Sequence, residues 1–372
     1  MNCNKSKTVV ILSSRQSMFP SGNNLWVKNS QLAIKWIKEN NHILLSSTGM
    51  STWDLVTVLG QHYKIPMTLY IPAYDMADYR NRKTKIINDF ELDPDLVSFY
   101  PVYPDSEKSD KKYFLQKRDH IISETADIIV PVSFRMGGNI SNIINQNKNN
   151  KEINLDFITR YDNRRKVPVY KFEQHKINSQ ILDFNENYFI HWTRTFNKSW
   201  PDESRFKYYC DIANNDHYPR SAFETLDKII NSKKIIASDK NMPENRKTVS
   251  FSALTPIDII PLIRWRARFK QFSFEPYGIG IKKEIAIKYN IQPVIYYNKQ
   301  LPIKVDSDKI YLTQSIGKVT DWRHEKELRH ESDFDFSKIS KNDLVLFCYT
   351  KDEAIELENK FGIKTISFIV YN

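Results

Sequence analysis

The sequence predicts two domains, an α/β domain built on a parallel sheet and an α+β domain after it. Its 372 residues are enough to form two hydrophobic cores. Over residues 1–145, short apolar runs alternate with segments of helical spacing, which is typical of a parallel sheet covered by helices on both faces. After residue 186 the strands are isolated and rich in Tyr, Ile and Val, and one clear helix stands among them, which favours an α+β domain.

In the first half, strands and helices are expected in alternation. The expected strands cover 8–13, 42–46, 66–71 and 126–131, and the expected helices cover 29–40, 53–62 and 113–125. A stretch rich in Asn and Lys follows at 146–152, where little can be buried. We therefore expect a first domain at 1–150, a connector at 151–185 and a second domain at 186–372.

In the second half, strands are expected at 188–192, 292–297, 344–349 and 365–370, and a helix at 221–232. The stretch from Trp322 to Arg329 is interpreted as a further strand. That strand would carry Arg323, Glu325, Glu327 and Arg329 on one face. Carboxylates held by arginines stay ionised at pH 7. This face either lines a reaction cleft or forms an exposed ladder of ion pairs.

Composition narrows the classes of partner. The net charge of +11 favours anionic partners such as nucleotides or nucleic acid. The three cysteines lie far apart, so neither a disulfide framework nor a metal site is expected. No apolar run approaches the ~20 residues of a membrane helix, and the first apolar run is too short for a signal peptide. We therefore expect a cytoplasmic protein without a membrane partner.

Two turns in the first half are candidate anion sites. The turns Ser46–Ser51 and Ser133–Asn139 each follow a strand and precede a helix. Backbone N–H groups at the start of a helix attract anions, and ligands of doubly wound sheets bind at the carboxyl ends of strands. An ordinary βα turn with a helix cap is the alternative for either one.

The order of these segments resembles the SLOG superfamily, in particular the Rossmann-like domain of the DNA-processing protein A type. The resemblance covers about residues 8–145 and is carried by Ser47–Ser51, Phe114–Ile122, Ala126–Val130 and Arg135–Asn139. It implies a domain that senses a nucleotide-derived ligand. The ligand-binding candidates are Ser13, Arg15, Thr48, Gly49, Ser51, Arg118, Arg135, Gly137 and Gly138.

Two alternatives stay open for this half. Arg118 is either a ligand contact or one partner of a structural ion pair. Some members of the superfamily hydrolyse nucleoside monophosphates with a P-G-G-x-G-T-x-x-E motif. This chain lacks that motif, which argues against a nucleotide glycosidase.

Residues 188–350 resemble a group of bacterial domains with a late W-x-x-E-x-E-x-[RW]-R-like strand. The layout of those domains is similar to that of ADP-ribosyltransferases, including the DNA-targeting toxins of that fold. The resemblance is carried by His191–Thr193, Leu226–Ile230, Ile235–Ser238, Val249–Ser252, Tyr277–Ile281, Pro293–Tyr297 and the strand with Glu327. It implies an ADP-ribosyltransferase-like domain that uses NAD.

The resemblance implies catalytic roles for four residues. Glu327, with Glu325 second, would stabilise the positive charge that develops on the ribose and take a proton from the acceptor. His191 would hydrogen-bond the adenosine-side ribose, and Tyr277 would stack on nicotinamide.

The cofactor-binding candidates surround these residues. Ser250 and Ser252 would orient Glu327 or the ribose. Arg323 and Arg329 would hold the carboxylates or bind the diphosphate. The remaining candidates are Thr193 and Arg194.

Other interpretations of three of these segments stay open. His191 is also placed like a half-buried strand histidine bonded to the backbone, and Tyr277-Gly278 like the start of a strand. The basic run 264–270 interleaves cations with aromatics, which suits nucleic acid or NAD phosphates. An amphipathic surface helix has the same pattern.

The sequence therefore favours an enzyme of the bacterial defence or toxin type, in which a nucleotide-sensing domain controls NAD-dependent ADP-ribosyl transfer or NAD hydrolysis. The defence role is an analogy. The alternative is a non-enzymatic protein that binds single-stranded nucleic acid. The expected partners are a nucleotide-derived small molecule, a nucleic-acid or protein acceptor, and a second copy of the chain.

Overall fold

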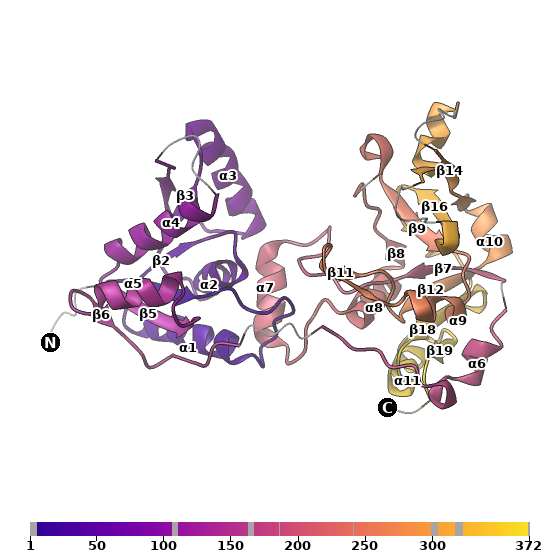
Figure 1. Ribbon diagram of the computed structural model, residues 1–372, viewed down its shortest axis with the longest axis horizontal. Helices are drawn as coiled ribbons and strands as arrows, with labels where there is room; N and C mark the ends of the chain where they lie inside the picture. The colour runs from indigo at the N-terminus through magenta and orange to yellow at the C-terminus, as the bar shows by residue number, and fades with distance from the viewer. Residues whose placement is uncertain are drawn as a thin grey trace. The chain divides into compact units, whose positions relative to one another are not determined.

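The computed structural model describes residues 6–105, 111–162, 167–185, 187–240, 242–298, 304–316 and 323–370. The chain forms two compact units, and each is described by itself (Figure 1). The first unit consists of Met1–Val167 and Glu203–Pro219, and the second consists of Pro168–Asp202 and Arg220–Asn372. This division differs from the predicted one. The predicted connector is shared between the units, and a segment from the second half of the sequence belongs to the first unit.

The first unit is built on a six-stranded sheet in the order β4-β3-β2-β1-β5-β6, with all neighbours parallel. Its strands are β1 (Thr8–Ser13), β2 (Ile43–Ser47), β3 (Met67–Pro72), β4 (Val97–Val102), β5 (Ile128–Ser133) and β6 (Glu152–Ile153). Its helices are α1 (Leu25–Glu39), α2 (Ser51–His62), α3 (Met76–Asp89), α4 (Lys111–Thr125), α5 (Asn139–Asn147) and α7 (Arg205–Asn214). The predicted Rossmann-like α/β fold of this half is confirmed.

The central strands β1 and β5 are buried along almost their whole length, because both faces of the sheet are covered there (Figure 1). Val9 and Ile11 of β1 belong to a core formed with α1 and α2, whereas Val10 and Leu12 belong to a second core formed with α4 and α5. The alternation of side chains along a strand therefore supplies both cores from one apolar run.

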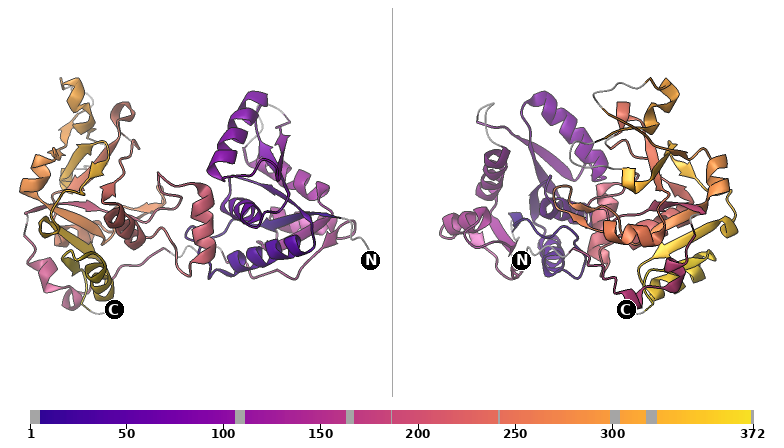
Figure 2. Two further views of the ribbon diagram at one scale, coloured as in Figure 1. Left: turned by 180° about the vertical axis from the view of Figure 1, so that it is seen from behind. Right: turned by 45° about the vertical axis from the view of Figure 1, so that its right-hand side comes forward.

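Helix α7 lies outside the predicted first domain but packs in its core. Tyr209 and Ile212 are buried in the core that contains α1 and α2, and Figure 2 shows α7 beside α2. Arg205 and the Tyr209 hydroxyl both contact the carboxylate of Asp54 on α2, at 3.4 and 3.3 Å. The sequence did not reveal this docking, because an amphipathic helix does not indicate which core it joins.

The second unit is built on a seven-stranded sheet in the order β13-β16-β9-β7-β12-β18-β19. Its strands are β7 (Tyr188–Trp192), β9 (Thr248–Ser252), β12 (Gly278–Lys282), β13 (Gln292–Pro293), β16 (Glu327–Glu331), β18 (Leu344–Cys348) and β19 (Thr365–Ser367). β18 and β19 pair parallel, and the other neighbours pair antiparallel.

Within the described residues, three short strand pairs and five α-helices complete the second unit, which agrees with an α+β fold. The pairs are β8 (Lys234–Ile235) with β17 (Phe334–Asp335), β10 (Trp265–Arg266) with β11 (Gln271–Phe272), and β14 (Ile295–Tyr297) with β15 (Thr313–Ser315). The helices are α6 (Ser179–Leu182), α8 (Ala222–Ser232), α9 (Pro256–Ile259), α10 (Lys283–Lys288) and α11 (Lys351–Phe361). Among the helices of the described residues, none has the length and apolar character that crossing a bilayer requires.

The prediction of a strand from Trp322 to Arg329 was wrong for the residues before Glu327. The strand β16 begins at Glu327, because Arg323–Glu325 form a 3-10 turn and Lys326 has a left-handed backbone with φ 44°. Arg323 and Glu325 therefore do not share a strand face with Glu327. Trp322 lies outside the described residues.

Three other predicted elements also differ from the structure. The basic run 264–270 lies in the β10–β11 hairpin and is not a surface helix. The strand predicted at 292–297 is divided into β13 and β14. The last predicted strand ends at Ser367. In the first unit, α3 and β4 lie in a stretch for which the sequence suggested no element.

Asp54 is a buried charge of the first unit, with 5% of its surface exposed. Burial raises the pKa of Asp54 to about 6, against the opposing effects of a hydrogen bond from Gly49 N–H and of the Arg205 charge. The unfolded chain has an ordinary aspartate pKa near 4. The folded protein therefore binds this proton more tightly, and its stability decreases as the pH rises from about 4 to about 6.

We expect Asp54→Asn to stabilise the first unit at neutral pH, because it removes the cost of the buried negative charge while keeping an oxygen acceptor. The gain should grow from near zero at about pH 4 to roughly 3 kcal/mol at pH 7. It can be measured by urea denaturation at both pH values, with hydrogen exchange reporting on peptides of the first unit. Asp89→Asn is the control, because Asp89 faces the same Arg205 at 3.8 Å but is far more exposed. An equal gain at both pH values would contradict the assignment.

Candidate functional site

The strands β7 and β9 diverge in the second unit. Within the described residues, their register contains the single pair Ile190–Ser252, although each strand has five residues. β7 is paired with its other neighbour, β12, over its whole length. The residues beyond Ile190 on β7, and before Ser252 on β9, therefore border an opening in the sheet.

A small cleft of about 90 Å³ lies at this opening. Its polar lining consists of Arg194, Ser250, Ser252, Ser273, Glu325 and Glu327. Its apolar lining includes Ile190, Trp192 and Phe274. Both carboxylates that the sequence singled out thus reach one cleft, although they come from different elements.

Glu327 is held by two neighbours. The Ser250 hydroxyl on β9 donates to Glu327 Oε1 at 2.8 Å, and Arg329 donates to both carboxylate oxygens at 2.9 and 3.2 Å. Ser250 and Arg329 are Cα partners across β9 and β16, so the strand register sets this geometry. The prediction that Ser250 and Arg329 hold Glu327 agrees with these contacts.

Arg329 is buried, with 3% of its surface exposed. In addition to Glu327, it donates to the backbone carbonyls of Tyr311 and Thr313 at 2.9 and 3.0 Å, and to Gln314 Oε1 at 2.8 Å. The second role predicted for Arg329, binding the diphosphate of a cofactor, does not fit this position. Arg323, on the 3-10 turn, is exposed.

Glu325 reaches the cleft from the 3-10 turn. The Ser252 hydroxyl donates to the Glu325 carbonyl at 2.7 Å and accepts a hydrogen bond from Leu254 N–H at 3.1 Å. Ser252 therefore fixes the backbone of the turn rather than a ribose. Burial, followed by the negative charge of Glu327, raises the pKa of Glu325. This carboxylate takes up a proton more readily than an exposed glutamate.

Arg194 is exposed and lines the same cleft, just after β7. Thr195, the residue after Arg194, anchors the backbone beside it. Thr195 donates to the buried Glu275 carboxylate through its N–H at 2.6 Å and its hydroxyl at 2.8 Å, and Tyr170 donates to it at 2.7 Å. Glu275 was not among the residues predicted from the sequence. Its position after a basic and aromatic run gave no signal that it would be buried.

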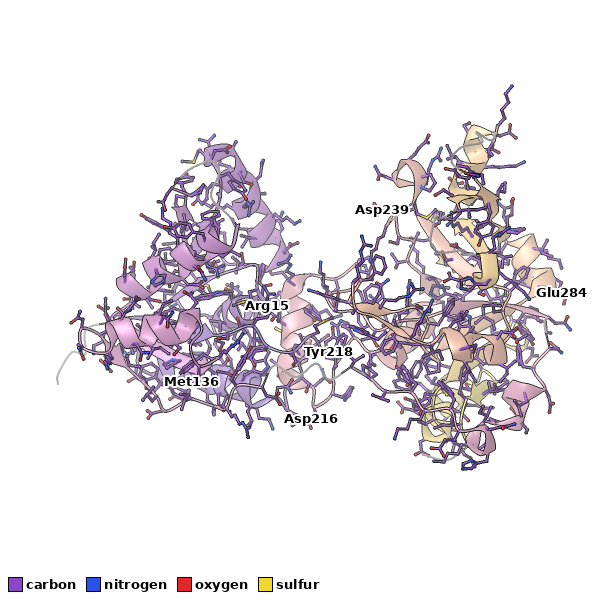
Figure 3. All side chains as sticks on the ribbon, in the orientation of Figure 1. Arg15, Met136, Asp216, Tyr218, Asp239 and Glu284 are labelled. Carbon is purple, nitrogen blue, oxygen red and sulfur yellow. The ribbon has the colours of Figure 1, made fainter. Side chains whose placement is uncertain are left out.

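A larger cleft of about 800 Å³ adjoins the small one, because Trp192, Arg194 and Ser250 line both. Residues 195–202 after β7 and helix α8 supply much of its lining. The loop between β8 and β9, where Figure 3 labels Asp239, adds Ser238 and Lys240. A volume of this size is typical of pockets that bind cofactors and small molecules.

His191 lines the larger cleft but points to the opposite face of the sheet from Glu327. The partners Ile190, Ser252 and Glu327 share one face, and His191 shares the other with its partner Ile279. Its Nδ1 lies 2.8 Å from the Ser250 carbonyl, and burial lowers the pKa of His191 to about 4. The ring is neutral at pH 7. Nδ1 therefore carries the proton, and Nε2 is a hydrogen-bond acceptor.

Tyr277 and Thr193 are structural residues. The Tyr277 ring is buried in the core, and its hydroxyl donates to Glu353 at 2.9 Å. The stacking role predicted for Tyr277 does not fit this location. The Thr193 hydroxyl is buried and lies near the backbone carbonyls of Ala222 and Tyr277, at 3.0 and 3.3 Å, so it is not placed to bind a cofactor.

In the first unit, the candidate ligand site lies at the ends of β1 and β5, where the strand order of the sheet changes direction. Arg15 (labelled in Figure 3) and Arg135 follow these strands and are exposed. Gly137 precedes α5 and has φ +69°, a conformation that other residues rarely adopt. Ser13 and Ser133, the last residues of β1 and β5, are Cα partners. Neither buried hydroxyl has a partner within the described residues.

The predicted turn Ser46–Ser51, which contains Thr48, Gly49 and Ser51, is closed by the protein itself. The Gly49 N–H donates to the Asp54 carboxylate at 2.8 Å, which occupies the place of an external anion. Arg118 is buried, pairs with Asp119 at 2.7 Å and donates to the Thr48 carbonyl at 3.2 Å. Of the two interpretations of Arg118, the geometry favours the structural ion pair.

Within the described residues, no group of three or more His, Cys, Asp or Glu side chains is placed to hold a metal ion. Comparison of the sequence with protein-family models and with proteins of curated function found no match. Two solved structures of DNA processing protein A are similar to 40% of the chain, at 12% identity. The match covers 63% of the Helicobacter pylori protein, with a TM-score of 0.29, and 50% of the Streptococcus pneumoniae protein, with a TM-score of 0.30. A similarity this low determines no property of this chain, and the ADP-ribosyltransferase resemblance of the second half stays a prediction.

Replacing Arg329 by Met should destabilise the second unit by about 3–5 kcal/mol, because it leaves the Glu327 carboxylate and three acceptors without their buried donor. The free energy of unfolding can be measured by urea denaturation. Arg246→Met is the matched control. Arg246 forms an ion pair at 3.0 Å with Glu331 on the same strand, but that pair is exposed and should contribute less than ~1 kcal/mol. Similar losses in the two variants would refute a special role for Arg329.

Proposed function

We propose that the second unit cleaves NAD at the bond between nicotinamide and ribose, and transfers the ADP-ribosyl group to an acceptor or to water. The observation that carries this proposal is the position of Glu327. Its carboxylate is fixed by Ser250 and Arg329 in a cleft that also contains Glu325 and Arg194. The 800 Å³ cleft beside it is large enough for a dinucleotide.

The lining of the larger cleft suits the parts of NAD. Because His191 and Glu327 face opposite sides of the sheet, NAD would extend across the opening between β7 and β9. On the His191 side, the neutral ring offers Nε2 as an acceptor for a ribose hydroxyl. Arg194 and Lys198 are exposed cations in the lining and can bind the diphosphate. Phe196, with 37% of its surface exposed, offers an aromatic ring to a base. Tyr277 and Thr193 have no part in this proposal.

The chemistry needs a fixed negative charge and a proton acceptor. Glu327 stabilises the positive charge that develops on the ribose as its bond to nicotinamide breaks and the bonding electrons leave with nicotinamide. The acceptor, or water, then forms a bond to the same carbon and loses a proton. Glu325 is the group placed to take that proton, because its pKa is raised by burial and by Glu327.

The first unit would regulate this reaction by binding a nucleotide-type ligand at the ends of β1 and β5. Arg15 and Arg135 are exposed there, and the N–H groups at the start of α5 favour an anion. A sensing unit joined to a unit that consumes NAD suits an antiphage defence effector or toxin of the cytoplasm, and this role is an analogy.

Glu327→Gln should reduce nicotinamide release from NAD by about a hundredfold or more, because the amide keeps the shape but removes the charge. The assay is run with nucleoside phosphates present, so that a regulated enzyme is not missed. Glu331→Gln is the matched control, since Glu331 lies on the same strand but contacts the exposed Arg246. Equal activity of the two variants, or no release by the wild-type protein, would argue against the proposal.

Ligand binding to the first unit should be visible as stabilisation. A nucleoside phosphate at about a hundred times its Kd should add about 2.7 kcal/mol to the stability of the unit that binds it. Arg15→Ala/Arg135→Ala should abolish this gain, because it removes the cations near the phosphate. Arg80→Ala/Lys85→Ala, which removes two exposed cations of α3, should retain it. Thermal unfolding with and without ligand measures the effect, and a gain that persists in the first variant would place the ligand elsewhere.

The second candidate function is non-enzymatic binding of single-stranded nucleic acid. The net charge of +11 and the exposed basic hairpin favour it. Gel-shift titration of single-stranded DNA separates the two functions. Binding that persists in Glu327→Gln, together with no nicotinamide release by the wild-type protein, would support the non-enzymatic nucleic-acid-binding function.

A further inference from the structure

We infer that the β10–β11 hairpin, residues 264–273, docks a single-stranded nucleic acid as the acceptor for the reaction at Glu327. This inference rests on the proposed function and adds the class of acceptor. Three observations support it: the charge of the hairpin, its contacts with the small cleft, and the aromatic ring that it exposes.

The hairpin is strongly basic. Arg264, Arg266, Arg268 and Lys270 lie within seven residues, and the sequence contains no Asp or Glu from 259 to 274. Arg264, Arg268 and Lys270 are exposed. The repulsion among these cations is not relieved inside the segment, which favours a polyanion as its partner.

The hairpin forms one edge of the small cleft that contains Glu325 and Glu327. Arg266 Nε donates to the Ser273 hydroxyl at 2.7 Å, and Ser273 and Phe274 line the small cleft. The positive charge of Arg266 is close enough to lower the pKa of Glu325, against the larger effect of burial. Gln271 lines the larger cleft and accepts a hydrogen bond from Lys240 at 3.3 Å. A polymer bound along the hairpin would therefore pass beside the reacting carbon.

The two aromatic residues of the hairpin have different environments. Trp265 packs against Phe272 with ring centroids 5.3 Å apart, which stabilises the hairpin. Phe269, between Arg268 and Lys270, leaves 51% of its surface exposed. The Arg268 guanidinium lies 5.8 Å from its ring. An exposed aromatic ring can stack on a base, and the cations on either side of it can bind the neighbouring phosphates. An acidic peptide would use the cations and leave the ring in water, so we choose nucleic acid.

The test compares Arg268→Glu/Phe269→Ala with a matched control in the full chain. The control, Ile287→Ala/Lys288→Glu, removes one exposed apolar side chain and reverses one exposed cation on α10. Each protein is titrated against a short fluorescein-labelled single-stranded oligonucleotide, followed by fluorescence anisotropy. Both pairs are also made in the Arg15→Ala/Arg135→Ala background, so that binding to the first unit does not hide the effect. The hairpin variant should bind at least about tenfold more weakly than the control, with a shallower salt dependence.

Activity separates this inference from the proposed function. With labelled NAD and the oligonucleotide, we expect the hairpin variant to lose label transfer by about tenfold or more and to retain nicotinamide release. Binding and transfer equal to those of the control would overturn the inference. Label found on proteins of a cell extract and not on the oligonucleotide would also overturn it, while supporting the proposed function. If no protein releases nicotinamide, the proposed function fails and the hairpin has no acceptor to dock, whatever the anisotropy shows.

Discussion

The buried guanidinium of Arg329 determines the geometry of the second unit's candidate site. A charge in the interior is tolerated when its hydrogen-bonding groups are satisfied. Arg329 meets this condition with the Glu327 carboxylate, two backbone carbonyls and the Gln314 side chain. These contacts tie β16 to residues 311–314 and give Glu327 one orientation. In the proposed reaction, this fixed position would direct the negative charge at the positive charge that develops on the ribose.

Both units place their candidate site residues where a regular sheet is interrupted. In the first unit the interruption is topological, because the chain leaves β1 in one direction and β5 in the other. In the second unit it is geometric, because β7 and β9 separate after one pair. In each unit the candidate residues lie at such an interruption, and the regular part of the sheet holds the strands that carry them.

The sequence predicted those elements that leave a local pattern. The strands Thr8–Ser13 and Tyr188–Trp192 have their predicted bounds, because an apolar run and an aromatic run mark buried strands. It also selected Glu325, Glu327 and Ser250 as members of one site. It could not detect the left-handed Lys326, which brings Glu325 into the cleft from a turn. Burial separates Tyr277 from the site, and burial depends on contacts distant in the sequence.

The docking of α7 in the first unit affects the order in which the protein is made. The first unit requires residues up to Pro219, so its core can be complete before the last third of the chain has left the ribosome. Glu325 and strand β16, which carries Glu327, lie about a hundred residues further along the chain. Domains usually fold in the order of synthesis. Under the proposed function, the unit that binds the regulating ligand would therefore fold before the NAD-cleaving centre is complete, which would protect the cell during synthesis.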